Sequence, residues 1–500
     1  MGEDVRTVAD ALRVKAGVIP DKVAHDDSFR TLTIAEWNKQ ADEVGGGLAK
    51  AGLKEGDRVF LPINNDNCIE MAIAVIGVMR AGGIAVPVNP RLMPQEILDY
   101  YNTIEPRFAI TNVPDRMSGI PLEKVWTTDA MPRDASALPD QTKLTNKDAL
   151  IMGTSGTTGK IKGVVMTHAD LAANHGDGTI VDKNHNSTLH ALPFTGSGGM
   201  LGECLLPIRA GNTSYTLAHF DPGKMLELVE LKRPTTIYFV PTMLRLVLDH
   251  PNAPKTDFSS VRYIMTGTAP LPHDSVVRTL KYWPHVYMRN SYGMSEGGIG
   301  VSTRTKEQLL KPGCVGTMPP NMELRDENGK KITEKNVVGE MYGKSNNPRR
   351  YWRDDAASAS AFPDGYTKSG DLGYIDDDGD LIMAGRSKEL IIRGGYNITP
   401  LEIETVLHGH PAVEQAAVIG VDHEVLGEDI AAAVSLREGQ TTTPEEIMAF
   451  AKGQLADNKV PRTIVILKEL PMNANSKVLK RELKPILQKA ADERRGATKA

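Results

Sequence analysis

Residues 149–166 read ALIMGTSGTTGKIKGVVM, and this stretch decides how the rest of the chain is interpreted. Its two apolar ends, Ala149–Ile151 and Val164–Met166, predict strands. Between them, three glycines within seven residues permit positive φ and let backbone N–H groups converge on an anion. Four hydroxyls add donors, and Lys160 or Lys162 supplies positive charge. The stretch predicts a phosphate-binding loop, because a flexible linker is rarely flanked by two apolar strands.

This loop does not have the spacing of a Walker loop. That pattern requires glycine, four residues, and then Gly-Lys-Ser/Thr. Gly159-Lys160 has Thr154 where the first glycine should stand, and Ile161 follows the lysine. The phosphate chemistry therefore belongs to another class of nucleotide-binding protein.

Outward from the loop, short apolar β-branched runs alternate with helical runs. Such alternation is typical of an α/β fold with largely parallel sheets covered by helices, whose small-molecule sites lie at the carboxyl ends of the strands. The clearest strands are expected at residues 58–63, 83–88, 235–240, 261–265 and 286–288, and the clearest helices at 68–80, 93–104 and 242–249.

Near residue 376 the composition changes at the polar turn Asp376–Asp380. A compact alternation of strands and helices follows, long enough for a small α+β domain. We expect a large N-terminal region at residues 1–384, a junction at 385–388, and a small C-terminal domain at 389–500.

The composition excludes several classes of protein. Over 500 residues, 58 Lys and Arg against 63 Asp and Glu give a net charge of −5, which argues against a nucleic-acid partner. The most apolar stretch, residues 71–88, is interrupted by Arg80 and cannot span a membrane, and the acidic N-terminus is no signal peptide. Three scattered cysteines fit neither a disulfide framework nor a zinc site. We expect a cytoplasmic protein without an integral membrane segment.

A second motif, Asn290-Ser291-Tyr292-Gly293-Met294-Ser295-Glu296, carries chemistry that suits the loop. Tyr292 offers a face for adenine, Ser295 a hydroxyl for the α-phosphate, and Glu296 a carboxylate for Mg²⁺, which prefers one or two carboxylates plus phosphate oxygens. Together the loop and this motif resemble the signatures of the adenylate-forming superfamily, which includes acyl-CoA synthetases, coumarate-CoA ligases and firefly luciferase. Ser295 stands where that family usually has threonine.

The resemblance covers roughly residues 30 to 485 and implies ATP, Mg²⁺ and coenzyme A as cofactor and co-substrates. It implies that the loop residues and Lys162 hold phosphate, that Gly267-Thr268-Ala269-Pro270 lies along adenine, and that Asp371 accepts both ribose hydroxyls. Arg386 would contact ribose or phosphate, and Lys388 would be the hinge between domains. The implied nucleotide residues are Thr154, Ser155, Gly156, Thr157, Thr158, Gly159, Lys162, Gly267, Thr268, Ala269, Pro270, Asn290, Tyr292, Gly293, Asp371, Arg386 and Lys388.

Two further segments are assigned by the same resemblance. Lys477, in Pro471-Met472-Asn473-Ala474-Asn475-Ser476-Lys477, would neutralise charge on the acyl carboxylate and α-phosphate during adenylation. Gly394 and Gly395 would line the tunnel for pantetheine, which favours CoA as the acceptor. The catalytic set is therefore Lys477, Ser295 and Glu296, with Glu296 as the metal ligand.

The chain departs from the family in the expected acyl-pocket segment, residues 192–199. Relatives commonly carry an aromatic-His pair there, whereas this chain has Thr195 and Gly196, and His190 is expected to be a strand residue. Ile161 and Ser476 also replace the usual Pro and Gly. The glycine-rich segment would enlarge the pocket, and because it offers no cation we expect an acid with an uncharged apolar body.

The expected function is an ATP-dependent acyl-CoA ligase acting on a fatty, aromatic or alicyclic acid, with small molecules as partners; a homodimer is left open. One alternative is a serine hydrolase, because Gly293-Met294-Ser295-Glu296-Gly297 matches the nucleophile-elbow pattern. That alternative leaves the phosphate loop and Lys477 unexplained. Another is an adenylating enzyme with a non-CoA acceptor, and a third is a binding module that keeps only the fold.

Overall fold

The computed structural model describes residues 7–143, 147–155, 161–175, 186–472 and 478–499. Its contacts divide the chain into two compact units. Unit one comprises Met1–Ala269, Arg278–Gly300 and Gly343–Thr367, and unit two comprises Pro270–Val277, Val301–Tyr342 and Lys368–Ala500. The predicted junction at 385–388 falls inside unit two, and the domain boundary stays a prediction. Over the described ranges, no helix is long and apolar enough to cross a membrane.

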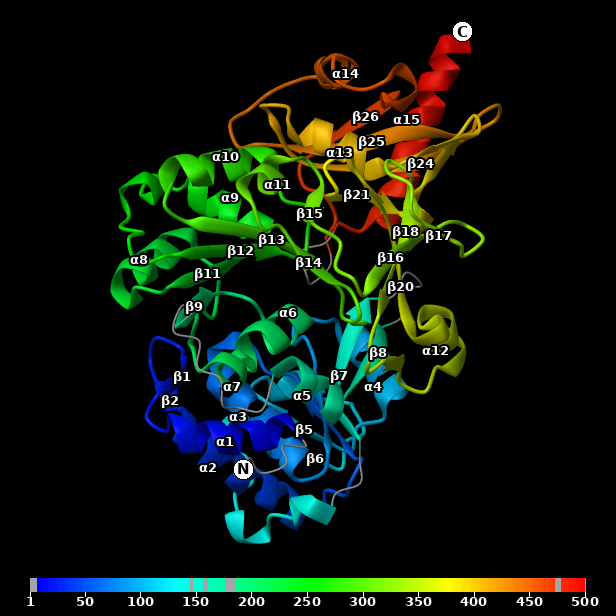
Figure 1. Cartoon of the computed structure of the whole chain (residues 1–500). Coiled ribbons are helices and arrows are strands. Elements are labelled where there is room, and N and C mark those ends of the chain that lie inside the picture. The colour runs from blue at the N-terminus through cyan, green and yellow to red at the C-terminus, as the bar shows by residue number, and fades with distance from the viewer. Residues whose placement is uncertain (1–6, 144–146, 156–160, 176–185, 473–477, 500) are drawn as a thin grey trace. The chain divides into compact units, whose positions relative to one another are not determined.

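An eight-stranded sheet forms one half of unit one (Figure 1). Its order is β14 (Gly300–Ser302), β13 (Tyr287–Gly293), β12 (Tyr263–Gly267), β11 (Thr236–Phe239), β9 (Ser187–His190), β10 (Thr213–Thr216), β1 (Val23–Asp26) and β2 (Thr31–Thr33). The strands from β1 to β13 pair in parallel, and α8 (Pro222–Lys232) and α9 (Pro241–Asp249) pack side by side next to them. The predicted strands of this region are confirmed, within two residues at their starts.

A seven-stranded sheet forms the other half of unit one. Its order is β19 (Arg350–Tyr351), β8 (Ile161–Thr167), β7 (Asp148–Ser155), β4 (Ile84–Pro87), β3 (Arg58–Leu61), β5 (Phe108–Thr111) and β6 (Lys124–Thr127). Helix α3 (Cys68–Arg80) has the predicted bounds, and every one of its residues is buried. An all-round apolar helix has to be buried, and α3 packs against α2 (Ile34–Lys50) in the main core. The remaining helices of this half are α1 (Val8–Val18), α4 (Pro94–Ile104), α5 (His168–His175), α6 (Ser197–Gly199) and α7 (Leu206–Ala210).

A six-stranded sheet lies mainly in unit two, and the sequence analysis did not foresee it. Its order is β15 (Cys314–Gly316), β21 (Leu381–Arg386), β20 (Tyr366–Ile375), β18 (Gly339–Lys344), β16 (Met322–Arg325) and β17 (Lys331–Ile332). The pairs β15–β21, β20–β21 and β16–β17 are antiparallel. Helix α11 (Lys306–Leu310) belongs to unit two and α12 (Asp355–Ala361) to unit one, while α10 (His273–Tyr282) contains residues of both. The short polar strands alternate weakly in hydrophobicity, which left them without a clear sequence signal.

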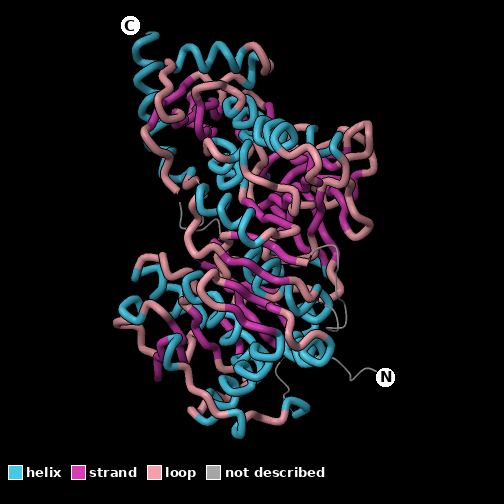
Figure 2. The backbone as a smooth tube through the Cα atoms, turned by 90° about the vertical axis from the view of Figure 1, so that its left-hand side faces the viewer, coloured by secondary structure: helices cyan, strands magenta, loops and turns pink. Residues whose placement is uncertain are grey.

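The C-terminal part of unit two is a sheet with both faces covered. Its strands are β22 (Ile391–Arg393), β23 (Tyr396–Ile398), β24 (Val413–His423), β25 (Gly427–Leu436) and β26 (Thr463–Leu467). Alternate residues of β24 enter two different cores: Val418 packs with α13 (Pro400–His408) and Ile419 with α15 (Lys480–Lys499). Helix α14 (Pro444–Lys452) completes this part, and Figure 2 shows strands gathered into sheets with helices around them.

Candidate active site

The phosphate-loop stretch forms a β-hairpin. Strands β7 and β8 pair antiparallel, with Thr154 opposite Lys162 and Ser155 opposite Ile161. The pairing brings the two ends of the loop together, as the flanking strands predicted. Gly156, Thr157, Thr158 and Gly159 lie outside the described residues.

The second motif leaves the carboxyl end of β13 and turns. Ser295 Oγ lies 2.7 Å from Ser197 Oγ, within the segment expected to line the acyl pocket. Asn290, within β13, accepts a 3.3 Å hydrogen bond from the hydroxyl of Thr266 on β12. The turn is followed by strand β14 rather than by a helix. A nucleophile elbow requires a strand-to-helix turn, so Ser295 does not have the setting of a hydrolase nucleophile.

Tyr351 connects the two motifs. Its hydroxyl donates a 3.0 Å hydrogen bond to Glu296 Oε1, and the ammonium of Lys162 lies over its ring, 4.7 Å from the centroid. Burial, and then the negative charge of Glu296, raises the pKa of Tyr351, so the hydroxyl remains protonated and can act as the donor. Tyr351 belongs to β19, which pairs with β8 beside the phosphate hairpin. Sequence reasoning missed it, because its two partners are far from it along the chain.

Arg349 fixes the turn of the second motif. Its Nε donates to Asp170 Oδ2 at 2.7 Å and its Nη1 to the carbonyl oxygen of Ser295 at 2.5 Å. The side chains of Arg349 and Asp170 are only 7% and 8% exposed. A buried ion pair that also binds a loop carbonyl fixes the loop, since all three groups would be costly to leave unpaired. No sequence pattern indicated this arginine.

The segment Gly267–Pro270, which the resemblance expects to lie along adenine, begins at the same sheet edge as the second motif. Gly267 ends β12 and stands opposite Ser291 of β13, so Gly267–Ala269 and Asn290–Glu296 both lie near this carboxyl edge. A Cβ on Gly267 would come within 2.7 Å of Tyr238 Oη and 2.8 Å of the Ser291 carbonyl, and glycine is required there for close approach. Thr268 has φ +72, the left-handed region. Pro270 belongs to unit two.

In unit two, antiparallel pairing brings together Asp371 and Arg386. They face each other across β20 and β21, and Arg386 Nε donates to Asp371 Oδ1 at 3.1 Å. Lys388 follows in the 3₁₀ turn Ser387–Glu389. Gly394 and Gly395 form the two-residue turn of the β22–β23 hairpin, both at positive φ, as such tight turns require. Lys477 lies outside the described residues.

The expected acyl-pocket segment, residues 192–199, ends in an irregular helix that continues beyond it. Ser197–Gly199 is one helical turn, and Met200–Cys204 continues it as a π-helix, a form often found at functional sites. A Cβ added to Gly198 or Gly202 would meet no atom within 4 Å, so this wall has open space beside it. Glu203 of the same helix is buried, and burial raises its pKa well above the usual range.

His190 is a buried residue of β9, as expected. Its Nε2 lies 2.9 Å from Ser214 Oγ, and its Nδ1 accepts a 3.1 Å hydrogen bond from the backbone N–H of Leu192. Burial, with a smaller contribution from His25, lowers the pKa of His190 to about 3. A neutral, hydrogen-bonded histidine of this kind has a structural role.

Glu296 suits Mg²⁺ better than the acidic turn of unit two does. Within the described part of the chain, Glu296 Oε2 makes no hydrogen bond and is left for a cation. Asp376, Asp378 and Asp380 are grouped closely enough to hold a metal, but the ammonium of Lys311 lies 2.6, 2.9 and 2.6 Å from their carboxylates. The lysine already supplies the positive charge that this turn needs.

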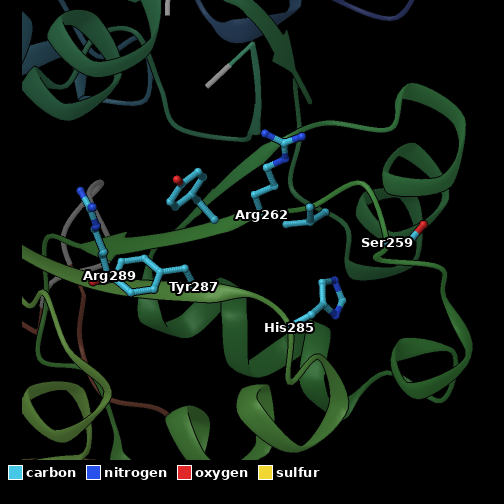
Figure 3. Close-up of a pocket in the computed structure, with 7 residues that line it drawn as sticks. Ser259, Arg262, His285, Tyr287 and Arg289 are labelled. Carbon is cyan, nitrogen blue, oxygen red and sulfur yellow. The ribbon is translucent and has the colours of Figure 1, made fainter. Parts of the chain in front are cut away.

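A cavity of about 350 Å³ in unit one lies away from these motifs (Figure 3). Its lining comes from the starts of β12 and β13, whereas the motif residues follow the ends of those strands. Figure 3 shows Arg289 beside Tyr287, and its guanidinium lies 5.2 Å from the ring centroid. Parallel α/β sheets bind ligands at the carboxyl ends of strands, and we do not assign this cavity to the reaction.

Comparison with known proteins identifies the family of this chain. A family model described as AMP-binding enzyme matches residues 12–352, and one described as AMP-binding enzyme C-terminal domain matches residues 402–477. The 2-succinylbenzoate–CoA ligase of Bacillus cytotoxicus is 30% identical over 489 residues, covering 97% of this chain and 100% of the relative. The feruloyl-CoA synthase of an Amycolatopsis species is 30% identical over 488 residues, covering 94% and 97%.

Solved structures also match this chain over nearly its whole length. The o-succinylbenzoate CoA synthetase from Bacillus subtilis, in complex with its acyl-adenylate intermediate, matches with a TM-score of 0.83 at 28% identity, covering 95% of this chain and 98% of that one. ATP-bound MatB from Rhodopseudomonas palustris gives a TM-score of 0.83 at 28% identity, covering 95% and 99%.

The fold and the motif residues together define an adenylate-forming enzyme. The chain belongs to the AMP-binding enzyme family and, within it, to the acyl-CoA synthetases. It is an AMP-forming ligase that uses ATP, Mg²⁺ and CoA.

Proposed function

We propose that this ligase activates an uncharged, largely apolar carboxylic acid of fatty, aromatic or alicyclic type. The carboxylate attacks the α-phosphorus of ATP, forming acyl-adenylate and releasing pyrophosphate. The CoA thiol then attacks the acyl carbon, forming the thioester and releasing AMP. The observation that carries the proposed adenylation step is the Tyr351 bridge, because one side chain joins Lys162 of the phosphate hairpin to Glu296 of the second motif.

Each candidate residue has a proposed task in the first step. Thr154, Ser155, the loop residues and Lys162 hold phosphate, and Gly267–Pro270, Asn290, Tyr292 and Gly293 surround adenine. Asp371 binds ribose, and Arg386 contacts ribose or phosphate. Ser295 donates to the α-phosphate, and Lys477 neutralises charge that develops between the acyl carboxylate and the α-phosphate. Glu296 would hold Mg²⁺, which when bound neutralises phosphate charge.

The second step needs a different arrangement of the same pocket. We propose that residues 389–500 rotate about Lys388, which removes Lys477 and brings Gly394 and Gly395 toward the pantetheine arm. The separate family matches to residues 12–352 and 402–477, with the junction between them, support a division of this kind.

The free, buried state of all three cysteines supports a reducing, cytoplasmic location.

The acyl-pocket segment supports an uncharged substrate body. Residues 192–201 contain no Lys, Arg or His, and Gly198 and Gly202 leave room for bulk. A second carboxylate on the substrate would find no cation on this wall, and an unpaired buried charge is costly.

ATP–pyrophosphate exchange over a panel of mono- and dicarboxylic acids, with and without CoA, tests the proposal. We expect exchange with apolar monocarboxylates, and CoA thioesters detectable by mass spectrometry. Exchange supported only by dicarboxylates would refute the pocket argument, and acyl-adenylate without thioester would refute CoA as the acceptor. Lys477→Ala should slow adenylation but largely spare thioester formation from supplied acyl-adenylate; equal loss of both would refute the division of labour.

A further inference from the structure

A partly buried lysine in unit two joins three separate segments of the chain. Lys480 is the first residue of α15, and its Nζ lies 2.5 Å from Glu389 Oε2 and 2.9 Å from Glu404 Oε1. Glu389 ends the 3₁₀ turn that contains Lys388, and Glu404 lies within α13. The lysine therefore links the chain just after the proposed hinge to two helices of the C-terminal part.

The surroundings make this link stronger than an exposed ion pair. The side chains of Lys480 and Glu404 are 24% and 15% exposed, and Glu404 Oε1 also accepts a 2.8 Å hydrogen bond from the backbone of Val418. Burial lowers the pKa of Lys480, but attraction to Glu404 and Glu389 outweighs it, and the net pKa is raised. Charge-assisted hydrogen bonds with little solvent screening are the strong ones.

A second ion pair holds the chain just before the hinge. Arg386, the last residue of β21, pairs with Asp371 of β20. The two ion pairs thus flank only Ser387 and Lys388 in sequence. Helix α13 also contacts β21, so a rotation at these two residues requires that contact to open.

The start of α15 is also fixed from its other side. Val478 forms a β-bridge with Met472, and the Leu479 N–H donates to the carbonyl of Pro471 at 2.8 Å. Lys477 directly precedes Val478 in sequence, outside the described residues. The described anchor nearest to Lys477 on its C-terminal side is therefore this bridge, followed by Lys480.

We propose that Lys480 is a positioning residue for adenylation: by binding Glu389 and Glu404 it makes the post-hinge chain and the start of α15 one rigid body. Rotation at Ser387–Lys388 then moves the start of α15 together with the post-hinge chain, instead of letting the two move separately. The inference rests on the proposed function, which supplies the roles of Lys388 and Lys477.

The test measures both half-reactions in the full-length enzyme. Lys480→Met should lower ATP–pyrophosphate exchange about tenfold, the weight of a charged hydrogen bond, with thioester formation from supplied acyl-adenylate changed by less than about threefold. Lys480→Arg keeps the charge and should restore exchange to within about threefold of wild type. Lys484→Met is the matched control, because Lys484 lies one turn further along α15 and pairs with Asp422 at 3.4 Å with both side chains exposed; it should change neither half-reaction.

Equal losses in both half-reactions, or a Lys480→Met enzyme that behaves like Lys484→Met, would overturn the inference. If Lys480→Met does not fold, Glu389→Gln serves instead, since it removes only the charge of the more exposed partner. Glu389→Gln should give the same selective loss of exchange, and a Glu389→Gln enzyme without that loss would also overturn the inference. A wild-type enzyme without exchange for any acid would refute the proposed function itself, and this inference with it.

Discussion

Arg349→Met should be among the most damaging single substitutions in unit one. The change removes the ion pair that Arg349 makes with the Asp170 carboxylate, which is 8% exposed, and the donor to the Ser295 carbonyl. Removing one partner of a buried ion pair costs about 3–5 kcal/mol, mostly because the other charge stays buried and unpaired. That is a large part of a total stability of about 5–15 kcal/mol.

Urea unfolding, followed by tryptophan fluorescence, measures this cost. With a urea dependence of about 3 kcal/mol per molar, the midpoint should fall by roughly 1 M. Arg350→Met is the control: the adjacent arginine is 46% exposed and pairs with Asp148 at 2.6 Å. An exposed pair contributes less than about 1 kcal/mol, and the control midpoint should move little.

A second substitution separates the buried charge from other effects. Asp170→Asn in the Arg349→Met background removes the carboxylate that Arg349 neutralises in the wild type, and it should recover about 1–2 kcal/mol of the free energy of unfolding. If Arg349→Met shifts the midpoint no more than Arg350→Met, or if Asp170→Asn adds a further full loss, the ion-pair reasoning is wrong.

Three more outcomes test other parts of the structure. Tyr351→Phe keeps the ring but removes the donor to Glu296, about 1 kcal/mol, so exchange should need roughly fivefold more Mg²⁺; an unchanged Mg²⁺ dependence would contradict the bridge. Gly202→Phe fills the open side of the acyl wall, and exchange with bulky acids should fall at least about tenfold while short acids are spared; equal rates for bulky acids would argue against this wall. As the pH falls below 6.5, three histidines become protonated in the unfolded state but stay neutral in the folded state, where burial lowers their pKa. Glu203 acts in the opposite direction: because its pKa is raised in the folded state, it binds a proton on folding, and this offsets one histidine. The histidines are His25, His168 and His190, with pKa values of about 3, 4 and 3. Near pH 5.5 the free energy of unfolding should therefore fall by about 2 kcal/mol for each unit by which the pH is lowered. A urea midpoint that stays constant from pH 7 to 5 would refute this.

The parts of the fold with strong local periodicity were predictable. Helix α3 was predicted with its bounds because apolar residues occur on all of its sides. The strands of the phosphate hairpin were predicted because each carries a short apolar run on either side of the glycine-rich loop. The antiparallel sheet of unit two was missed, since strands such as Lys331–Ile332 are too short and polar for a periodic signal.

The candidate site was predictable only where its residues are contiguous in sequence. Ser295 and Glu296 stand in one motif, whereas Arg349 and Tyr351 reach them only through the pairing of β19 with β8. The open space beside Gly202 depends on the direction in which each position of the π-helix faces. Long-range pairing and local helix irregularity are decided by tertiary packing, which leaves no periodic trace in a single sequence.

The division of the chain into two units has a consequence for synthesis on the ribosome. The chain passes between the units after residues 269, 277, 300, 342 and 367, so unit one lacks its last segment until Thr367 has been made. That last segment contains Arg349 and Tyr351. A nascent chain therefore exposes Asp170 and the motif turn before Arg349 and Tyr351 have been made, a state prone to aggregation. Slow translation beyond residue 300 should prolong that exposure, and split-protein designs should cut this enzyme only beyond residue 367.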